Sequence, residues 1–255
     1  MKIILLGTGT SQGIPVIGCS CAVCKSRDPH NNRNRSSALI IQNGISIVID
    51  TATEFRIQML KNNIKNIDAV LFTHAHADHV HGLDDIRQFN EIHGKTIPCF
   101  GNYQTIYTIR QKYDYVFNPT QQGGGKPDIS LNVVNSDFDI FGIKIIPLPV
   151  KHGKLDILGY RMDKFAYITD ASYIPDETMH KIKGLDVLVI NALRFEPHDT
   201  HFSVTEALEV IEKVKPRKTF LTHICHKLDH KETQKKLPKN VQMGFDGLLI
   251  EIEKE

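Results

Sequence analysis

Four side chains that can bind metal ions stand within six residues, in the motif His74-x-His76-x-Asp78-His79. The motif follows the apolar segment 69–72, which predicts a strand that ends in a tight loop. On such a loop, the first two histidines can point one way while the aspartate and the third histidine point the other. We therefore interpret the motif as a site for two adjacent metal ions rather than one.

Three further predicted strands end beside a candidate ligand. The segment 143–150 precedes His152, the segment 165–169 precedes Asp170, and the segment 218–222 precedes His223. In α/β folds, functional side chains gather at strand ends because the strands are rigid and the loops converge there. One such residue alone would be interpreted as a surface side chain, but the repeated pattern favours a shared site.

Three thiols within six residues form a second cluster, Cys19-x-Cys21-x-x-Cys24, on a predicted loop after the first strand. In a chain that we expect to be cytoplasmic, this spacing indicates three of the four ligands of a tetrahedral zinc ion. The local sequence leaves the fourth ligand open between His30, six residues further on, and the distant His226. Cys225 is a third option.

A candidate proton donor stands just before a predicted helix at 204–214. His201 precedes this helix, whose start carries the capping box Ser203-x-x-Glu206. A histidine at this place could act as a general acid that protonates a leaving oxygen. His198 is an alternative donor three residues earlier.

The elements that must position these residues are short apolar runs alternating with helical patterns. We expect strands at 2–6, 38–42, 45–49, 69–73, 97–100, 129–134, 143–150, 158–162, 165–169, 187–191, 218–222 and 248–252, and helices at 54–62, 84–89, 103–114, 176–182 and 204–214. This order predicts an α/β fold in a single domain spanning residues 1–255. Two mixed sheets would pack together with helices outside, as a four-layer αββα sandwich.

The composition is that of an ordinary globular protein, apart from 13 histidines in 255 residues. The 31 Lys and Arg nearly cancel the 29 Asp and Glu, which argues against a nucleic-acid partner. The start of the chain lacks a signal-peptide core, and no apolar run reaches the roughly 20 residues that span a bilayer. We therefore expect a cytoplasmic protein without a membrane partner. Arg33 and Arg35 fit a solvated turn, and His230 fits a surface or locally hydrogen-bonded position.

In its histidine motif and strand-end ligands, the chain resembles the metallo-β-lactamase-fold hydrolase superfamily. The resemblance implies that His74, His76 and His152 hold one catalytic metal, that Asp78, His79 and His223 hold the second, and that Asp170 bridges them. It also implies that Asp50, at the end of the predicted strand 45–49, braces the histidine loop. Zn²⁺, Mn²⁺ or Fe²⁺ would suit such mixed ligands, and we expect Zn²⁺ or Mn²⁺.

A narrower resemblance rests on the segment Gly7–Pro15, the cysteine cluster, the segment Leu221–His226 and the segment Gly244–Gly247. Together they are similar to the phosphodiesterases of the carbon–phosphorus lyase pathway, which open a phosphoribosyl cyclic phosphate. This resemblance implies that His226 rather than His30 completes a structural zinc site with Cys19, Cys21 and Cys24. It also implies that His201 rather than His198 is the catalytic histidine, and that the protein forms a homodimer.

The sequence thus predicts a dinuclear metal-dependent phosphodiesterase that hydrolyses a small cyclic or nucleotide-like phosphodiester. A metal-bridging hydroxide would attack phosphorus, and His201, Asp78 and Asp50 would be its catalytic side chains. One alternative is a tRNA 3′-processing endonuclease, for which the only loop long enough to grip RNA is the glycine-rich segment Gln121–Pro127. Others are a quinone-cofactor biosynthesis protein of the same fold and a non-enzymatic metal-binding protein.

Overall fold

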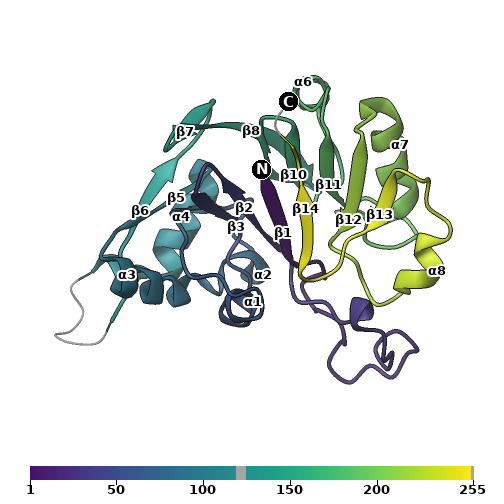
Figure 1. The fold of residues 1–255 in the computed structure, drawn as a ribbon, viewed down its shortest axis with the longest axis horizontal. Helices are drawn as coiled ribbons and strands as arrows, with labels where there is room; N and C mark the ends of the chain where they lie inside the picture. The colour runs from purple at the N-terminus through teal and green to yellow at the C-terminus, as the bar shows by residue number, and fades with distance from the viewer. Residues whose placement is uncertain (119–124, 254–255) are drawn as a thin grey trace.

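The computed structural model describes residues 1–118 and 125–253, and these residues form two seven-stranded sheets (Figure 1). The first sheet has the order β14-β1-β2-β3-β4-β5-β6, and the second has the order β13-β12-β11-β10-β9-β8-β7. The first contains β1 (Lys2–Gly7), β2 (Ser37–Gln42), β3 (Ile45–Ile49), β4 (Ala69–Leu71), β5 (Ile97–Gly101), β6 (Ile129–Val133) and β14 (Leu248–Glu251). The second contains β7 (Phe138–Ile140), β8 (Ile143–His152), β9 (Leu155–Met162), β10 (Phe165–Ile168), β11 (Val187–Asn191), β12 (Lys218–Thr222) and β13 (Val241–Met243).

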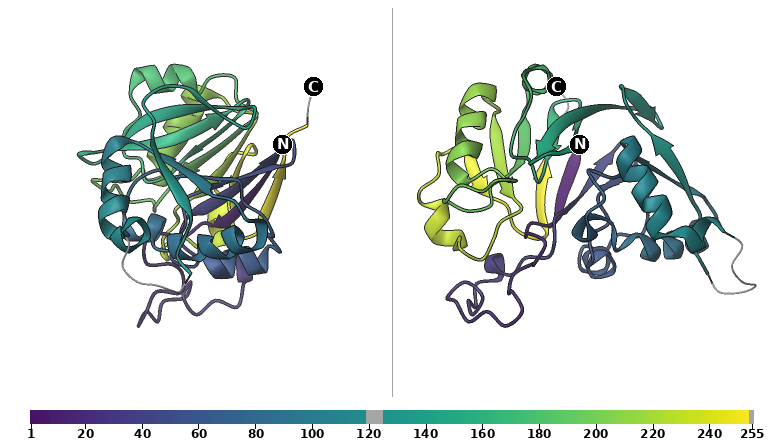
Figure 2. Two further views of the ribbon diagram at one scale, coloured as in Figure 1. Left: turned by 90° about the vertical axis from the view of Figure 1, so that its left-hand side faces the viewer. Right: turned by 180° about the vertical axis from the view of Figure 1, so that it is seen from behind.

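Helices cover the outer face of each sheet, as the views in Figures 1 and 2 show. The outer core of the first sheet includes side chains from α1 (Phe55–Lys61), α2 (Ala77–Val80), α3 (Arg87–His93), α4 (Tyr103–Lys112) and α5 (Asp114–Phe117). The outer face of the second sheet packs against α6 (Asp176–Lys181) and α7 (Val204–Val214), and α8 (His230–Gln234) contacts β13. Two 3₁₀ turns, Pro29–Asn31 and Leu83–Ile86, complete the regular structure of the described residues.

Alternating burial along the strands explains why the sheets pack face to face. In β3, Ile47 and Ile49 enter the core between the sheets, whereas Val48 joins the core under the helices. Side chains at i and i+2 of a strand share one face, so a continuously apolar strand can serve two cores. Three buried clusters result, one between the sheets and one under each helical layer. The predicted αββα sandwich is therefore confirmed.

The twelve predicted strands all form, with small shifts at their ends. The hairpins turn at Asn43-Gly44 and at Asp163-Lys164. The predicted helix at 84–89 is wrong in its bounds, since a 3₁₀ turn occupies Leu83–Ile86 and α3 begins only at Arg87. Most of the segment Gln121–Pro127 lies outside the described residues. Among the described residues, no helix is long and apolar enough to cross a membrane.

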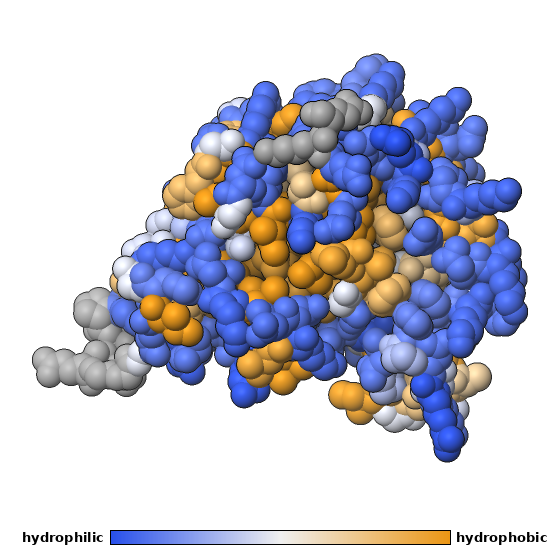
Figure 3. All heavy atoms as spheres, in the orientation of Figure 1, coloured by the Kyte–Doolittle hydropathy of each residue, from blue (hydrophilic) through white to orange (hydrophobic). Residues whose placement is uncertain are grey.

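The surface is hydrophilic over most of the face seen in Figure 3. Apolar side chains gather near the middle of this face, over the region of β1 and β14. In β14, Leu249 has half of its surface exposed. The candidate ligands lie after β4 of the first sheet and at or just after the ends of β8, β10 and β12 of the second sheet. Both sheets therefore contribute to one site.

Candidate functional site

The structure brings the strand-end residues together in two adjacent groups of ligand atoms. His74, His76 and His152 form one group, and Asp78, His79, Asp170 and His223 form the other. Within each group, one ligand atom per residue lies within 4.8 Å of all the others. The structure thus brings together the residues that the family resemblance assigns to each metal ion, with Asp170 in the second group.

Asp170 lies where the two groups meet. Its Oδ1 atom is 3.1 Å from Nδ1 of His223 and 3.4 Å from Nε2 of His79. It also forms a third group of ligand atoms with His152 and His201. A carboxylate with neighbours in both groups is suited to bridging two cations.

Three of the residues at the strand ends adopt a left-handed backbone conformation. The φ angles are 61° at Asp50, 58° at Asp170 and 53° at His223. Residues other than glycine are uncommon in this region, and the strain is of order 1 kcal/mol or more at each position. Such strain clusters at functional sites, where the surrounding structure holds it in place. In this chain, Asp170 and His223 belong to the ligand groups, and Asp50 contacts His79 of one of them.

Two buried ring nitrogens support a fit to metal ions. Nε2 of His74 and Nε2 of His79 are buried and have no hydrogen-bond partner among the described residues. An unsatisfied buried polar atom is costly, and a metal ion would satisfy both nitrogens. We therefore find that the donor set, which combines imidazole nitrogens with carboxylates, fits divalent transition metals.

Hydrogen bonds to the Nδ1 atoms of three candidate ligand histidines fix the orientation of their rings. Nδ1 of His79 donates to Asp50 Oδ2 at 2.7 Å, and Nδ1 of His152 donates to the carbonyl oxygen of Thr200 at 2.7 Å. The Thr73 hydroxyl donates to Asp50 and accepts from Nδ1 of His74. When Nδ1 is the donor, Nε2 keeps its lone pair and can bind a metal ion.

The electrostatics leave most of the candidate ligands in the state that binds cations. Burial lowers the pKa of His223 to about 4 and holds that of His74 well below its usual range. Burial acts to raise the pKa of Asp170, but His223 and His79 hold it well below its usual value. Neutral imidazoles and ionised carboxylates are the ligating forms.

Asp50 lies beneath the histidine loop, as the resemblance implies. Burial raises the pKa of its carboxyl group, and donors from His79 and Thr73 act in the opposite direction. The backbone N–H of Thr73 donates to Oδ1 at 2.8 Å, and the Thr73 hydroxyl donates to Oδ2 at 2.8 Å. Asp50 therefore connects the end of β3 with the loop after β4.

His201 reaches the ligand cluster, and His198 lies behind it. Nε2 of His201 is 3.3 Å from Asp170 Oδ2, and its ring stacks on that of His223 with the centroids 4.8 Å apart. Nδ1 of His198 is 3.3 Å from Nδ1 of His201. The geometry thus favours His201 as the histidine that faces a substrate.

The three thiols of the cysteine cluster surround one ring nitrogen of His226. Sγ of Cys19, Cys21 and Cys24 lies 3.2, 3.5 and 3.6 Å from its Nδ1 atom. His30 instead contacts Asp28 at 2.8 Å and stacks on His230. The geometry therefore favours His226 over His30 as the fourth ligand.

The pKa values of two thiols in the cluster move in opposite directions, since burial raises that of Cys24 to about 11 whereas that of Cys21 is lowered. The backbone N–H of Cys24 donates to Sγ of Cys21, and this bond is the main reason that the pKa of Cys21 falls to about 6. A thiolate is the form of cysteine that binds zinc.

The interpretation of Arg33 as part of a solvated turn is wrong. The side chain is buried, and its guanidinium donates to the Thr8 hydroxyl and to the carbonyl oxygen of Gly244. Sequence reasoning also missed Thr73, Thr200 and Ser36, which contact ligand rings through single oxygens. Thr73 and Thr200 adjoin predicted site residues, but Ser36 carries no local signal because its partner, His223, is 187 residues away.

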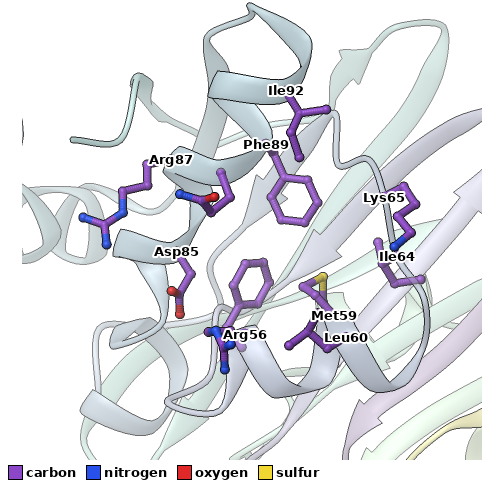
Figure 4. A pocket seen from close by; sticks show the side chains of 11 residues that line it. Arg56, Met59, Leu60, Ile64, Lys65, Asp85, Arg87, Phe89 and Ile92 are labelled. Atoms are coloured by element: carbon purple, nitrogen blue, oxygen red, sulfur yellow. The ribbon is translucent and has the colours of Figure 1, made fainter. Parts of the chain in front are cut away.

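A pocket of about 430 Å³ lies apart from the candidate ligands, between α1 and α3. Figure 4 shows its apolar side chains, among them Met59 and Phe89, with Arg87 directed away from them. None of the described residues that line it belongs to a metal-ligand group. Pocket size alone does not identify the functional site in this protein.

Comparisons with known proteins show the family and the fold of this chain. A β-lactamase superfamily domain model matches residues 46–224. An octanoyltransferase from Porphyromonas gingivalis is 37% identical to this chain over 97% of the chain's length. The chain spans about half (51%) of the length of that relative. A ribonuclease Z from Metallosphaera sedula is 25% identical over 60% of the chain and 45% of its own length.

Two solved structures share the fold over nearly the whole chain. A diphosphatase from the PhnP family is 41% identical, with a TM-score of 0.93 and coverage of 99% of this chain and 98% of that one. Zn²⁺-bound PqqB from Methylobacterium extorquens has a TM-score of 0.82 at 17% identity, covering 99% and 100% of the two chains, which shows likeness in fold alone. The chain therefore belongs to the β-lactamase superfamily, has the metallo-β-lactamase fold and is related to the PhnP family.

Proposed function

We propose that the protein is a dinuclear metal-dependent phosphodiesterase that acts on a small cyclic or nucleotide-like phosphodiester. The observation that carries this proposal is the position of Asp170 between the two groups of ligand atoms. Its carboxylate contacts His223 of the second group, lies close to His152 of the first group, and is 3.3 Å from Nε2 of His201. The relationship to a diphosphatase supports cleavage at phosphorus.

The roles of the side chains follow from their contacts. His74, His76 and His152 would hold one divalent cation, and Asp78, His79 and His223 the other, with Asp170 between them. When bound, the pair of ions would supply Lewis acidity and an activated water as the nucleophile. Asp50 would keep the ring of His79 oriented through its 2.7 Å hydrogen bond.

His201 would protonate the leaving oxygen. Its Nε2 atom faces the cluster, and its side chain is 13% exposed, so it can exchange protons with solvent between turnovers. The hydroxyl of Thr200 contacts Nδ1 at 2.9 Å and fixes the ring. A general acid placed in this way typically contributes a factor of about 10² to 10⁴ to the rate.

We further propose that the cysteine cluster and His226 hold a structural zinc ion. The chain would work as one domain, in the cytoplasm, on a soluble small molecule and as a homodimer.

The test compares substrates on one purified, Mn²⁺-loaded preparation. We expect hydrolysis of bis(p-nitrophenyl) phosphate, slower cleavage of precursor tRNA and no hydrolysis of β-lactams. Faster cleavage of precursor tRNA would instead favour an RNA hydrolase, as the names of the ribonuclease Z relatives suggest. Inactivity towards every phosphodiester would overturn the proposal and favour a quinone-pathway or non-enzymatic role.

A further inference from the structure

We propose that the pocket between α1 and α3 binds a second small molecule, an alkyl carboxylate of the medium-chain fatty acid type. The inference goes beyond the proposed function and does not rest on it, because none of the described residues that line the pocket belongs to a metal-ligand group. The occupant would therefore be a separate ligand and not the molecule that is hydrolysed.

The lining of this pocket is mainly apolar. Its floor is formed by Phe55, Met59 and Phe89, each at most 7% exposed, and the two phenylalanine rings meet edge to face with their centroids 6.3 Å apart. Leu60 and Ile92 form the rim and are 60% and 69% exposed. Large apolar side chains that remain exposed around a cavity are typical of a ligand-binding groove.

Hydrogen bonds hold the walls of the pocket in place without a ligand. The backbone N–H of Ile64 donates to the carbonyl oxygen of Met59 at 2.9 Å, which folds the segment after α1 back over the helix. Nε2 of His93, the last residue of α3, donates to the carbonyl oxygen of Lys65 at 2.7 Å and joins this segment to the opposite wall. A preformed pocket loses less conformational entropy on binding than one that must first be ordered.

The size of the pocket favours a small molecule over a protein partner. It has a volume of about 430 Å³ and is lined by 11 residues. Small-molecule pockets usually measure about 300–1,000 Å³, whereas a standard protein interface needs about 20–30 residues on each side. An alkyl chain supplies the apolar surface that this lining can bury.

The charged residues at the pocket favour a negative headgroup. Three of the lining residues are basic and one is acidic: Arg56, Lys65, Arg87 and Asp85. Arg87 pairs with Asp84 at 3.2 Å, whereas Lys65 forms no ion pair with any residue that the structure describes. Figure 4 shows Lys65 and Asp85 on opposite sides of the apolar side chains. A carboxylate at Lys65 would thus leave its alkyl chain among those side chains.

Calorimetric titration of the metal-loaded protein tests the alkyl chain and the headgroup separately. The probes are hexanoate, octanoate and decanoate, each below its micelle-forming concentration, and 1-octanol as the uncharged match of octanoate. We expect each added methylene to tighten binding about 2- to 4-fold, because the pocket buries part or all of it. Octanoate should bind about 3-fold more tightly than 1-octanol, as one exposed ion pair allows.

Two surface substitutions, each with a matched control, place the ligand in the pocket. Leu60→Ser should weaken octanoate and 1-octanol alike by about 3-fold, since it removes apolar contact. Ile57→Ser should not, because Ile57 lies on the same helix and is 39% exposed but does not line the pocket. Lys65→Met should bring the affinity for octanoate down to that for 1-octanol. Lys61→Met, which removes an exposed charge at the end of α1 outside the pocket, should change neither affinity.

Affinity that does not rise with chain length would overturn the proposal. So would an octanoate affinity in Leu60→Ser equal to that of the natural protein, because the carboxylate would then bind elsewhere, for instance at the metal ions. A preference for octanoate over 1-octanol that survives in Lys65→Met would contradict the placement of the headgroup. These measurements do not depend on turnover, so failure of the proposed phosphodiesterase activity would leave the inference standing.

Discussion

At the scale of single residues, His201 provides the sharpest test of the chemistry. Its Nε2 atom is 3.3 Å from Asp170, and it also belongs to a group of three ligand atoms. If it donates a proton, His201→Ala should lower kcat on bis(p-nitrophenyl) phosphate by about 100-fold or more without loss of bound metal. The measurement pairs steady-state kinetics with elemental analysis of the purified variant.

His198→Ala is the control for this prediction, because His198 contacts His201 but lies outside the ligand groups. It should retain most of the activity. Loss of a metal ion in His201→Ala would make this residue a ligand instead, and loss of turnover in His198→Ala alone would reverse the assignment.

His230 gives a pH-dependent prediction away from the metal ligands. Burial and the neighbouring Arg33 lower its pKa to about 4, and Arg33 Nη2 lies 3.1 Å from its Nδ1 atom. The unfolded chain therefore binds this proton more readily, so stability should fall as the pH drops from about 6.5 to 4. After allowance for solvent screening, the loss should be on the order of 1 kcal/mol.

Urea unfolding of the natural protein and of His230→Gln across this pH range isolates the effect. Other groups titrate equally in both proteins, so the difference between the two curves reports His230. A constant difference from pH 4 to 7 would contradict the prediction.

At the scale of elements, the long connection between β1 and β2 depends on contacts far along the chain. Apart from the turn at Pro29–Asn31, it has almost no regular structure. The cysteine cluster joins it to His226, just after the end of β12. This junction would hold the connection against the loop that carries His223.

Cys21→Ser should therefore remove one zinc ion per chain and lower the Tm, because the loop loses its anchor. Cys225→Ser is the matched control: Cys225 adjoins His226 in sequence but lies outside the ligand group. It should keep the full zinc content. Unchanged zinc stoichiometry in Cys21→Ser would refute the structural site.

The same scale shows what the sequence could and could not predict. Apolar segments such as β8 and β11 carry a clear pattern, whereas β7, β13 and α2 have only three or four residues and too little periodicity to detect. Metal-binding motifs were readable because the ligands are close in sequence. The local sequence could not decide between His30 and His226 as the fourth zinc ligand, because His226 lies 202 residues from Cys24. The left-handed backbone at Asp50 and Asp170 depends on tertiary structure and leaves no mark in the sequence.

At the scale of the whole molecule, the candidate site depends on how the two sheets are held against each other. The loop after β4 supplies one set of ligands, and β8, β10 and β12 supply or precede the others. Two hydrogen bonds join the sheets beside this loop. The backbone N–H of Leu158 donates to the carbonyl oxygen of Thr73 at 3.0 Å, and the Tyr160 hydroxyl donates to that of Phe72 at 2.7 Å.

Two buried tyrosines on adjacent strands allow a controlled test of this junction. Tyr160 of β9 and Tyr167 of β10 are direct partners in the ladder, and both are buried in the core between the sheets. The Tyr167 hydroxyl has no hydrogen-bond partner among the described residues.

Tyr160→Phe would leave the Phe72 carbonyl unsatisfied, so it should lower the free energy of unfolding by about 1–3 kcal/mol. Tyr167→Phe should change it by less than about 0.5 kcal/mol or increase it, because it removes a buried hydroxyl that has no partner. Urea unfolding measures both effects, and metal titration of Tyr160→Phe should show weaker binding, since His74 follows Phe72 by two residues. Equal effects of the two substitutions would mean that packing alone, and not this hydrogen bond, holds the sheets together at the site.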